Sequence, residues 1–330
     1  LRLCGPNSLI SDPIRVLRGV RLISSYDLSY GFGITEEMRV AIKKLGAVSG
    51  ERIRDELFKC LAVSNFDVAA GLMSDFGVFD QLRLLTFGVD PAEPYLQQDN
   101  AETLASLTGA ANKPVSGKSQ PDQILNAELV HLHAYQTMLE KSLQGGRKRR
   151  HLLLLCSIML HIHPAFDPGN SGKSKLLPGV FAEQISQALL TGQKENAYFK
   201  AVSGGFLRLA ELSMQEPGIL DYYRFFRDFG VHGLDSALLA MVEIKNQAPL
   251  LQFSAEICRE VFRLWFTEQE RIINPPRLVD GNILQSKLGI PPGAQIGYLL
   301  EAIREQQVLG MINTTEDALV FARGNVERKD

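Results

Sequence analysis

Cysteine is scarce in this sequence, and its spacing excludes two kinds of site. The 330 residues contain four cysteines, and no two of them form a Cys-x-x-Cys pair. A cysteine-rich zinc site or a disulfide framework is therefore not expected, and this usage predicts a reducing, cytoplasmic location. Cys60, Cys156 and Cys258 stand among apolar neighbours, which predicts that they are small core residues.

A strong net charge is also absent. The formal net charge is −2 at pH 7, so any contact with nucleic acid must come from a local basic surface. The longest strongly apolar run, residues 151–160, is too short to span a bilayer, and no basic-then-apolar leader is present, so no membrane partner is expected. The first residue is Leu1 rather than methionine, which leads us to expect further sequence upstream.

Sustained period-two alternation is missing too, whereas apolar residues recur every three or four positions along most of the chain. This pattern predicts an all-α, elongated, multi-helix fold. We predict four parts, called neck, linker or lid, body and tail: residues 1–87, 88–124, 125–272 and 273–330. The linker is predicted from its prolines, glutamines and glycines, and the tail follows the Pro275-Pro276 pair.

The most informative segment is Ser11-Asp12-Pro13-Ile14-Arg15-Val16-Leu17-Arg18-Gly19-Val20-Arg21. Asp12 is a good helix N-cap residue, and Pro13 suits a first helical position. Asp12 and the three arginines follow at intervals of three, which predicts a polar stripe on one side of the helix. The stripe has two interpretations: a surface helix with solvated arginines, or a nucleotide-selecting surface.

The second interpretation rests on hydrogen-bond complementarity. A carboxylate accepts from an exocyclic amino group, and a guanidinium donates to the adjacent ring nitrogen. Asp12 and Arg15, fixed one helical turn apart, would fit the Watson–Crick edge of adenine or cytosine and reject guanine and uracil.

This segment resembles the nucleotide-selecting helix of class II CCA-adding enzymes and bacterial poly(A) polymerases, whose pattern is Glu-Asp-x-x-Arg followed by further arginines. Ser11 replaces the glutamate, whereas Asp12 and Arg15 match the base-selecting pair. Arg18 and Arg21 match the trailing arginines, which the resemblance implies face triphosphate or RNA backbone. The next block, residues 49–59, resembles the family pattern Ser-x-Glu-Arg-x-x-x-Glu-x-x-Lys, and Glu51 and Arg52 are predicted to brace the first helix.

Two later segments continue the resemblance. Residues 221–239 are similar to the helical body of the family, and residues 288–318 are similar to its tail. In the tail, Gly293 precedes a predicted helix and is expected to help bind RNA, because helix N-termini bind phosphate readily.

The resemblance implies a function and also a missing part. The family's chemistry belongs to an N-terminal head with a Gly-rich segment and an Asp-x-Asp pair that holds Mg²⁺, and no Asp-x-Asp occurs in this chain. We therefore expect no catalytic residue and no metal ligand here. The chain would select ATP and CTP as substrates and hold the 3′ end of RNA, most simply tRNA, while an upstream or separately encoded head adds nucleotides. Alone, it is not expected to transfer nucleotides.

Two alternatives stay open from sequence. One is a headless RNA-binding or scaffold protein in which Asp12 and Arg15 serve only capping and packing. The other is an HD-type phosphohydrolase, because histidines gather around His161-Ile162-His163, although isoleucine stands where that family needs a metal-bridging aspartate. CCA, A-only and poly(A) addition are not distinguished.

Two further segments attract attention. The basic run Arg147-Lys148-Arg149-Arg150 is either a solvated turn or a sequence-independent RNA phosphate contact. Residues 169–174 resemble the end of a P-loop, but Asp167 stands where that motif needs glycine.

Overall fold

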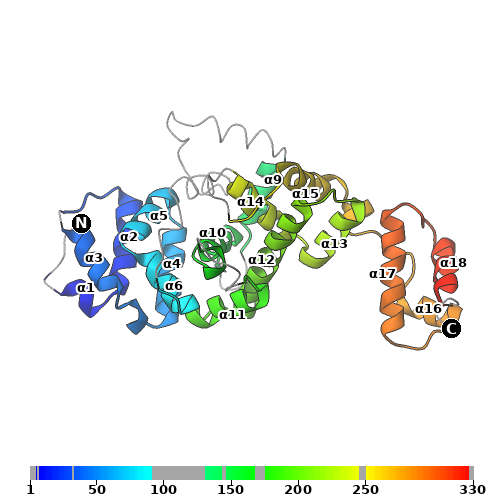
Figure 1. Cartoon of the computed structure of the whole chain (residues 1–330), viewed down its shortest axis with the longest axis horizontal. Helices are drawn as coiled ribbons and strands as arrows, with labels where there is room; N and C mark the ends of the chain where they lie inside the picture. Colours follow the sequence, from blue (N-terminus) through cyan, green and yellow to red (C-terminus); the bar gives the residue numbers. More distant parts are fainter. Residues whose placement is uncertain are drawn as a thin grey trace.

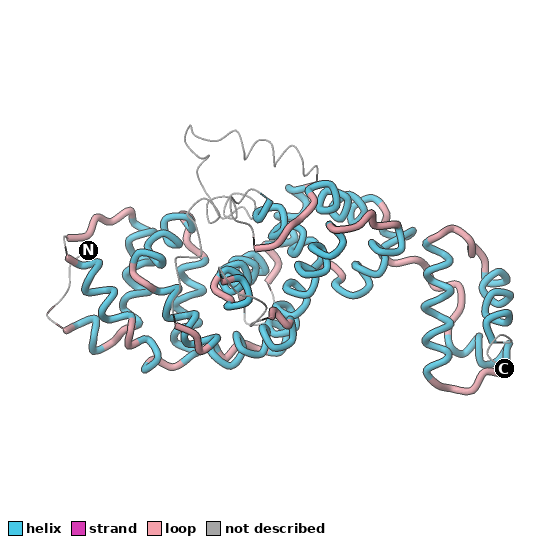
Figure 2. Tube along the Cα trace, viewed as in Figure 1, coloured by secondary structure: helices cyan, strands magenta, loops and turns pink. Residues whose placement is uncertain are grey.

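The computed structural model describes residues 5, 7–31, 33–90, 131–142, 146–167, 175–244 and 250–326. Every regular element in these ranges is a helix, and an isolated bridge joins Ser142 to Lys148. The predicted all-α class is confirmed, and the helices form an elongated arrangement with the two ends of the chain far apart (Figures 1 and 2).

The neck helices occupy one end of the molecule. Their bounds are α1 Ser8–Ser11, α2 Ile14–Tyr26, α3 Ile34–Ile42, the 3₁₀ turn η1 Leu45–Ala47, α4 Gly50–Leu61, α5 Phe66–Asp75 and α6 Val78–Phe87. The apolar spacing seen in the sequence buries one side of α2, because Ile14, Leu17 and Val20 are fully buried. The arginines between them consequently face away from the core.

The body helices follow. Their bounds are α9 Leu132–Leu139, α10 Arg149–His161, η3 Pro164–Phe166, α11 Pro178–Leu189, α12 Gln193–Ser213, α13 Ile219–Phe229, α14 His232–Ile244, α15 Ala255–Thr267 and the π-helical turn η4 Gln269–Ile273. Helix α10 is buried from Leu152 to His161, so the apolar run of the sequence is a central core helix. No helix within the described ranges is long and apolar enough to cross a membrane.

The tail contains α16 Gly281–Leu288, α17 Ala294–Val308 and α18 Thr315–Val326. These helices bury a small hydrophobic core of their own, whereas the apolar residues of the neck and body form one continuous cluster. The domain boundaries drawn from sequence stay predictions, and most of the predicted linker lies in residues 91–130, outside the described ranges.

The tail contacts the body mainly through α13 and α17. Arg224 makes two hydrogen bonds to Glu305, at 2.7 and 3.0 Å, and Arg227 donates to Glu301 at 2.7 Å. Val308, at the end of α17, is buried in the larger core. The tail therefore contacts the body through these arginine–glutamate pairs and through the buried side chain of Val308.

A close backbone approach joins the neck to the body where α4 begins. A Cβ atom on Gly50 would lie 2.4 Å from the carbonyl oxygen of Ala188, near the end of α11. Arg54, one turn further along α4, donates to the carbonyl of Leu190. Glycine is required at position 50 because any side chain would push the two helices apart.

Replacing Gly50 by alanine is expected to lower the free energy of unfolding by about 1–3 kcal/mol, as overpacking of a core typically does. Gly71, inside α5, is the matched control because a Cβ there meets nothing within 4 Å. Gly71→Ala is expected to raise stability by about 0.5–1 kcal/mol, because alanine is the better helix former. Urea unfolding followed by circular dichroism measures both, and equal effects of the two substitutions would contradict the close approach.

Candidate nucleic-acid interface

The arginine stripe lies on the exposed side of α2. The side chains of Arg15, Arg18 and Arg21 are 46%, 45% and 32% exposed. Each retains solvent access, so an anion can reach each guanidinium.

Asp12 stands directly before this helix and is held by two arginines. Its Oδ1 accepts from Arg52 Nη2 at 3.0 Å, and its Oδ2 lies 3.7 Å from Arg15 Nε. Arg15 also donates to the carbonyl of Ser8 at 3.1 Å. The helix begins at Ile14 with Pro13 at the N-cap and no side-chain cap. The expected capping role of Asp12 is therefore wrong, because its carboxylate accepts from the guanidinium of Arg52 instead.

The geometry around Asp12 leaves part of the carboxylate available. Oδ2 is beyond hydrogen-bond distance from Arg15, and the Asp12 side chain is 23% exposed. Oδ2 can therefore accept a hydrogen bond from the amino group of a bound base while Arg52 donates to Oδ1. Arg52, from α4, was predicted to brace the first helix, and it binds Asp12 just before α2. Glu51 was given the same role, but it is exposed.

Glu56 belongs to the motif of residues 49–59 but was given no role there; in the structure it organises the other half of the stripe. Its side chain is 6% exposed and lies 3.4 Å from both Arg18 Nε and Arg21 Nε, and Lys59 donates to it at 2.9 Å. Burial alone would raise the pKa of Glu56, but the hydrogen bond and charge of Lys59 and the charges of Arg21 and Arg18 lower it. Glu56 therefore stays ionised and aligns the two arginines. Its spacing of four from Arg52 was the available signal, because it places both residues on one face of α4.

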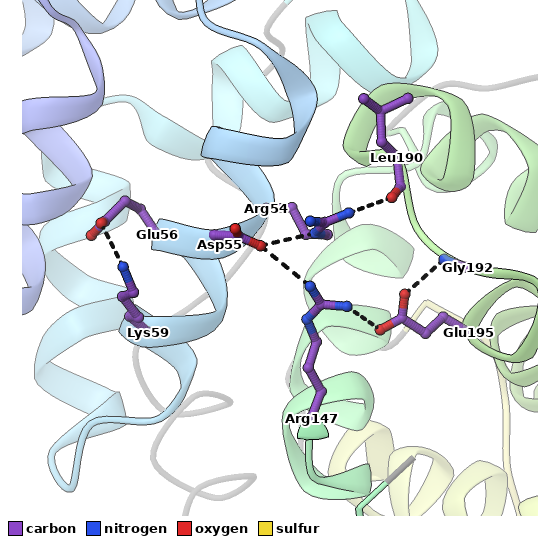
Figure 3. A network of polar contacts seen from close by, with 8 residues as sticks. All are labelled: Arg54, Asp55, Glu56, Lys59, Arg147, Leu190, Gly192 and Glu195. Atoms are coloured by element: carbon purple, nitrogen blue, oxygen red, sulfur yellow. Dashed lines mark hydrogen bonds and ion pairs between the residues drawn. The ribbon is translucent and has the colours of Figure 1, made fainter. Parts of the chain in front are cut away.

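The run Arg147–Arg150 is not one exposed surface. Arg147 joins the neck to the body: it donates to Glu195 on α12 at 2.7 Å and to Asp55 on α4 at 3.2 Å (Figure 3). Its guanidinium also lies 4.8 Å from the ring centroid of Phe58. Arg147 is thus engaged in a joint between helices.

The other three members of the run also have carboxylate partners. Lys148 and Arg150 donate to Glu140 at 2.6 and 2.8 Å near the surface. Arg149 is buried and makes two hydrogen bonds to Asp235, at 2.8 and 2.9 Å. The predicted exposed phosphate contact does not fit Arg149, because reaching RNA would leave the charge of Asp235 unpaired in the core.

Gly293 lies at the N-cap of α17 and is exposed, as predicted. Its φ of 163° is ordinary extended backbone, which any residue adopts, so no special freedom of glycine is used there. The P-loop-like residues 169–174 lie outside the described ranges.

The structure gives His161 a partner on each ring nitrogen. Nε2 lies 2.9 Å from Glu243, and Nδ1 lies 2.8 Å from the carbonyl of Ser157. Nearby, the backbone N–H of Ala165 donates to His163, and burial together with the charge of Arg83 lowers the pKa of His163 to about 4. No group of three or more possible metal ligands occurs among the described residues. These contacts leave the phosphohydrolase interpretation without support.

Comparison with known proteins gives these features a family context. Residues 31–85 match a family model described as the probable RNA and SrmB-binding site of polymerase A. The CC-adding tRNA nucleotidyltransferase of Geobacter sulfurreducens is 24% identical over 324 residues, which cover 96% of this chain and 64% of that protein. The chain thus spans about two thirds of the length of that relative.

Solved structures agree on the fold. A complex of a CCA-adding enzyme with ATP matches 98% of this chain and 63% of its own, with a TM-score of 0.58 and 16% identity. The Thermotoga maritima CCA-adding enzyme complexed with tRNA matches 98% of this chain and 64% of its own, with a TM-score of 0.56 and 17% identity. These matches show a shared fold, and residues 31–85 are similar to a probable RNA-binding site of polymerase A. The chain is similar to the C-terminal region of class II CCA-adding enzymes, and the predicted resemblance is confirmed.

The buried pair of His161 and Glu243 predicts a pH-dependent stability. Burial alone would lower the pKa of His161, but the hydrogen bond and charge of Glu243 raise it above the ordinary 6.5. A raised folded-state pKa means that the stabilisation is complete below the unfolded value and is lost as pH rises through the folded value. As pH rises above about 6.5, the ordinary value, the wild type is expected to lose more unfolding free energy than Glu243→Gln. Parallel pH profiles of the two proteins in urea unfolding would refute the charged pair.

Proposed function

We propose that this chain is the nucleotide-selecting and RNA-holding part of a tRNA nucleotidyltransferase-like or poly(A) polymerase-like protein. The observation that carries the proposal is the arrangement of Asp12, Arg15 and Arg52. One carboxylate oxygen is held by Arg52, and the other lies beside the guanidinium of Arg15. This leaves an acceptor and a donor side by side at the start of α2, which suits the amino group and ring nitrogen of adenine or cytosine.

The proposed substrates are accordingly ATP and CTP. Guanine and uracil present a carbonyl and a ring N–H where adenine and cytosine present an amino group and a bare nitrogen. They would set acceptor against acceptor and donor against donor, and the unpaired groups make rejection strong. CCA-adding enzyme complexes with ATP and with CTP share this fold, which supports the choice of ligands.

The proposed RNA partner is a tRNA 3′ end. Five cationic side chains lie around α2 and α4 against the carboxylates of Asp12 and Glu56: Arg15, Arg18, Arg21, Arg52 and Lys59. This is the local basic surface that a chain of net charge −2 needs in order to bind RNA. The polymerase A family model and the tRNA complex of the Thermotoga enzyme are consistent with it.

The proposed chemistry is addition of nucleotides to an RNA 3′-hydroxyl by a nucleotidyltransferase head that uses Mg²⁺. We assign that head to sequence beyond this chain. The described residues offer no cluster of oxygen or nitrogen ligands suited to a metal ion, so no metal-dependent step is derived from them. Their role is to choose the incoming nucleotide and to position the RNA.

Asp12→Ala and Arg15→Ala, made in a protein that includes the head, are expected to reduce discrimination of ATP and CTP against GTP and UTP by about tenfold or more, since each removes the acceptor or the donor that guanine or uracil would leave unpaired. Single-nucleotide incorporation with each triphosphate measures this. The exposed residues Glu216 and Arg271 supply controls, because Glu216→Ala and Arg271→Ala remove the same charges far from α2. Unchanged selectivity with intact RNA binding would contradict the nucleotide-selecting role of Asp12 and Arg15 and leave only the RNA-holding role.

A further inference from the structure

The exposed face of α2 continues past its arginines. The residues of this helix that are not buried are Arg15, Arg18, Arg21, Leu22, Ser25 and Tyr26. With 3.6 residues per turn these six lie on one side of the helix, and the distance along the axis from Arg15 to Tyr26 is about 16 Å. One solvent-facing strip therefore begins beside Asp12, carries three guanidinium groups and ends at an aromatic ring.

Tyr26 is unusual among the aromatic residues of the neck. Its side chain is 69% exposed, compared with 36% for Tyr30, which packs edge-on against the buried ring of Phe76 at 5.9 Å. Single exposed aromatics occur on most surfaces. Tyr26 differs from such residues because it lies at the end of a strip that carries three arginines.

The backbone at Tyr26 is fixed. Asp27 adopts the left-handed conformation, with φ 50° and ψ 47°, and its N–H donates to the carbonyl of Ile23. The N–H of Leu28 donates to the same carbonyl at 3.1 Å, and Asn65, at the N-cap of α5, donates to the carbonyl of Ser24 at 3.4 Å. These bonds close the helix end, so Tyr26 can offer its ring without first ordering the chain.

We infer that Tyr26 is a base-stacking platform at the end of a binding strip for single-stranded RNA on α2. The RNA phosphates would contact the exposed parts of the Arg18 and Arg21 guanidinium groups, which Glu56 holds in place, and one unpaired base would stack on the ring of Tyr26. Charge favours nucleic acid over a neutral partner, and an exposed ring favours an unpaired base over a duplex. This inference rests on the proposed function, because it adds a contact to the same RNA-holding surface.

The test compares two polyanions, a short single-stranded RNA and inorganic polyphosphate, which carries charge but no bases. Tyr26→Ala is expected to weaken RNA binding by about 5- to 100-fold, the usual worth of one stacked base, and to leave polyphosphate binding unchanged. Tyr26→Phe is expected to retain RNA affinity, because the ring rather than the hydroxyl makes the contact. Fluorescence anisotropy of labelled RNA, and polyphosphate competition in the same assay, measure these affinities.

Arg18→Ala and Met214→Ala serve as controls. Arg18→Ala is expected to weaken both ligands and to reduce the salt dependence of RNA binding. Met214 is 85% exposed at the end of α12, so Met214→Ala removes an exposed apolar side chain elsewhere and is expected to change neither affinity.

The outcomes separate the two proposals. If Arg18→Ala weakens RNA binding and Tyr26→Ala does not, the stacking platform is overturned and the RNA-holding role of α2 stands. If neither substitution affects RNA binding, the RNA-holding role of α2 fails as well. If Tyr26→Ala weakens RNA and polyphosphate equally, or lowers the melting temperature of the chain, Tyr26 is structural and the inference is overturned.

Discussion

Helix α4 is the element on which the arrangement of the candidate interface depends, because it is held from two sides. Arg52 and Glu56 face α2 and bind Asp12, Arg18 and Arg21. Arg54 and Asp55 lie toward the body, where they bind the carbonyl of Leu190 and the guanidinium of Arg147 (Figure 3). Gly50 lets the same helix approach α11 closely. A movement of the body that displaced α4 would therefore move the guanidinium of Arg52 and the carboxylate of Glu56, which hold Asp12 and the arginines of the stripe.

Burial separates arginines that can bind RNA from those that cannot. The guanidinium groups of Arg15, Arg18 and Arg21 are partly exposed, so a phosphate can reach them while they stay beside the carboxylates of Asp12 and Glu56. Arg149 is paired with Asp235 inside the body, where breaking a pair costs about 3–5 kcal/mol. Arg83 is similar: it is 1% exposed and binds Asp167 and the carbonyl of Ile162, which joins α6 to the body.

The positions of most helices could be predicted because local periodicity determines which face of a helix is apolar. The stripe on α2 and the bracing by Arg52 were also predictable, since helix geometry and a motif place those residues. Gly293 shows the limit of such reasoning: its place at the start of α17 was predictable, but its extended backbone conformation was not. The roles of Arg147 and Arg149 were not predictable either, because their partners lie far away in the sequence.

The sequence by itself therefore determined the helical class, the amphipathic character of α2 and the order of the motifs, all of which depend on residues close together in the chain. Only the tertiary structure decided which charges are free to bind RNA. Arg147 and Arg149 are two positions apart, yet Arg147 joins α4 to α12 and Arg149 is enclosed beside Asp235. Which carboxylate an arginine binds depends on which one lies nearby in the fold, and its freedom to bind RNA depends on its access to water. The spacing of residues along one helix determines neither.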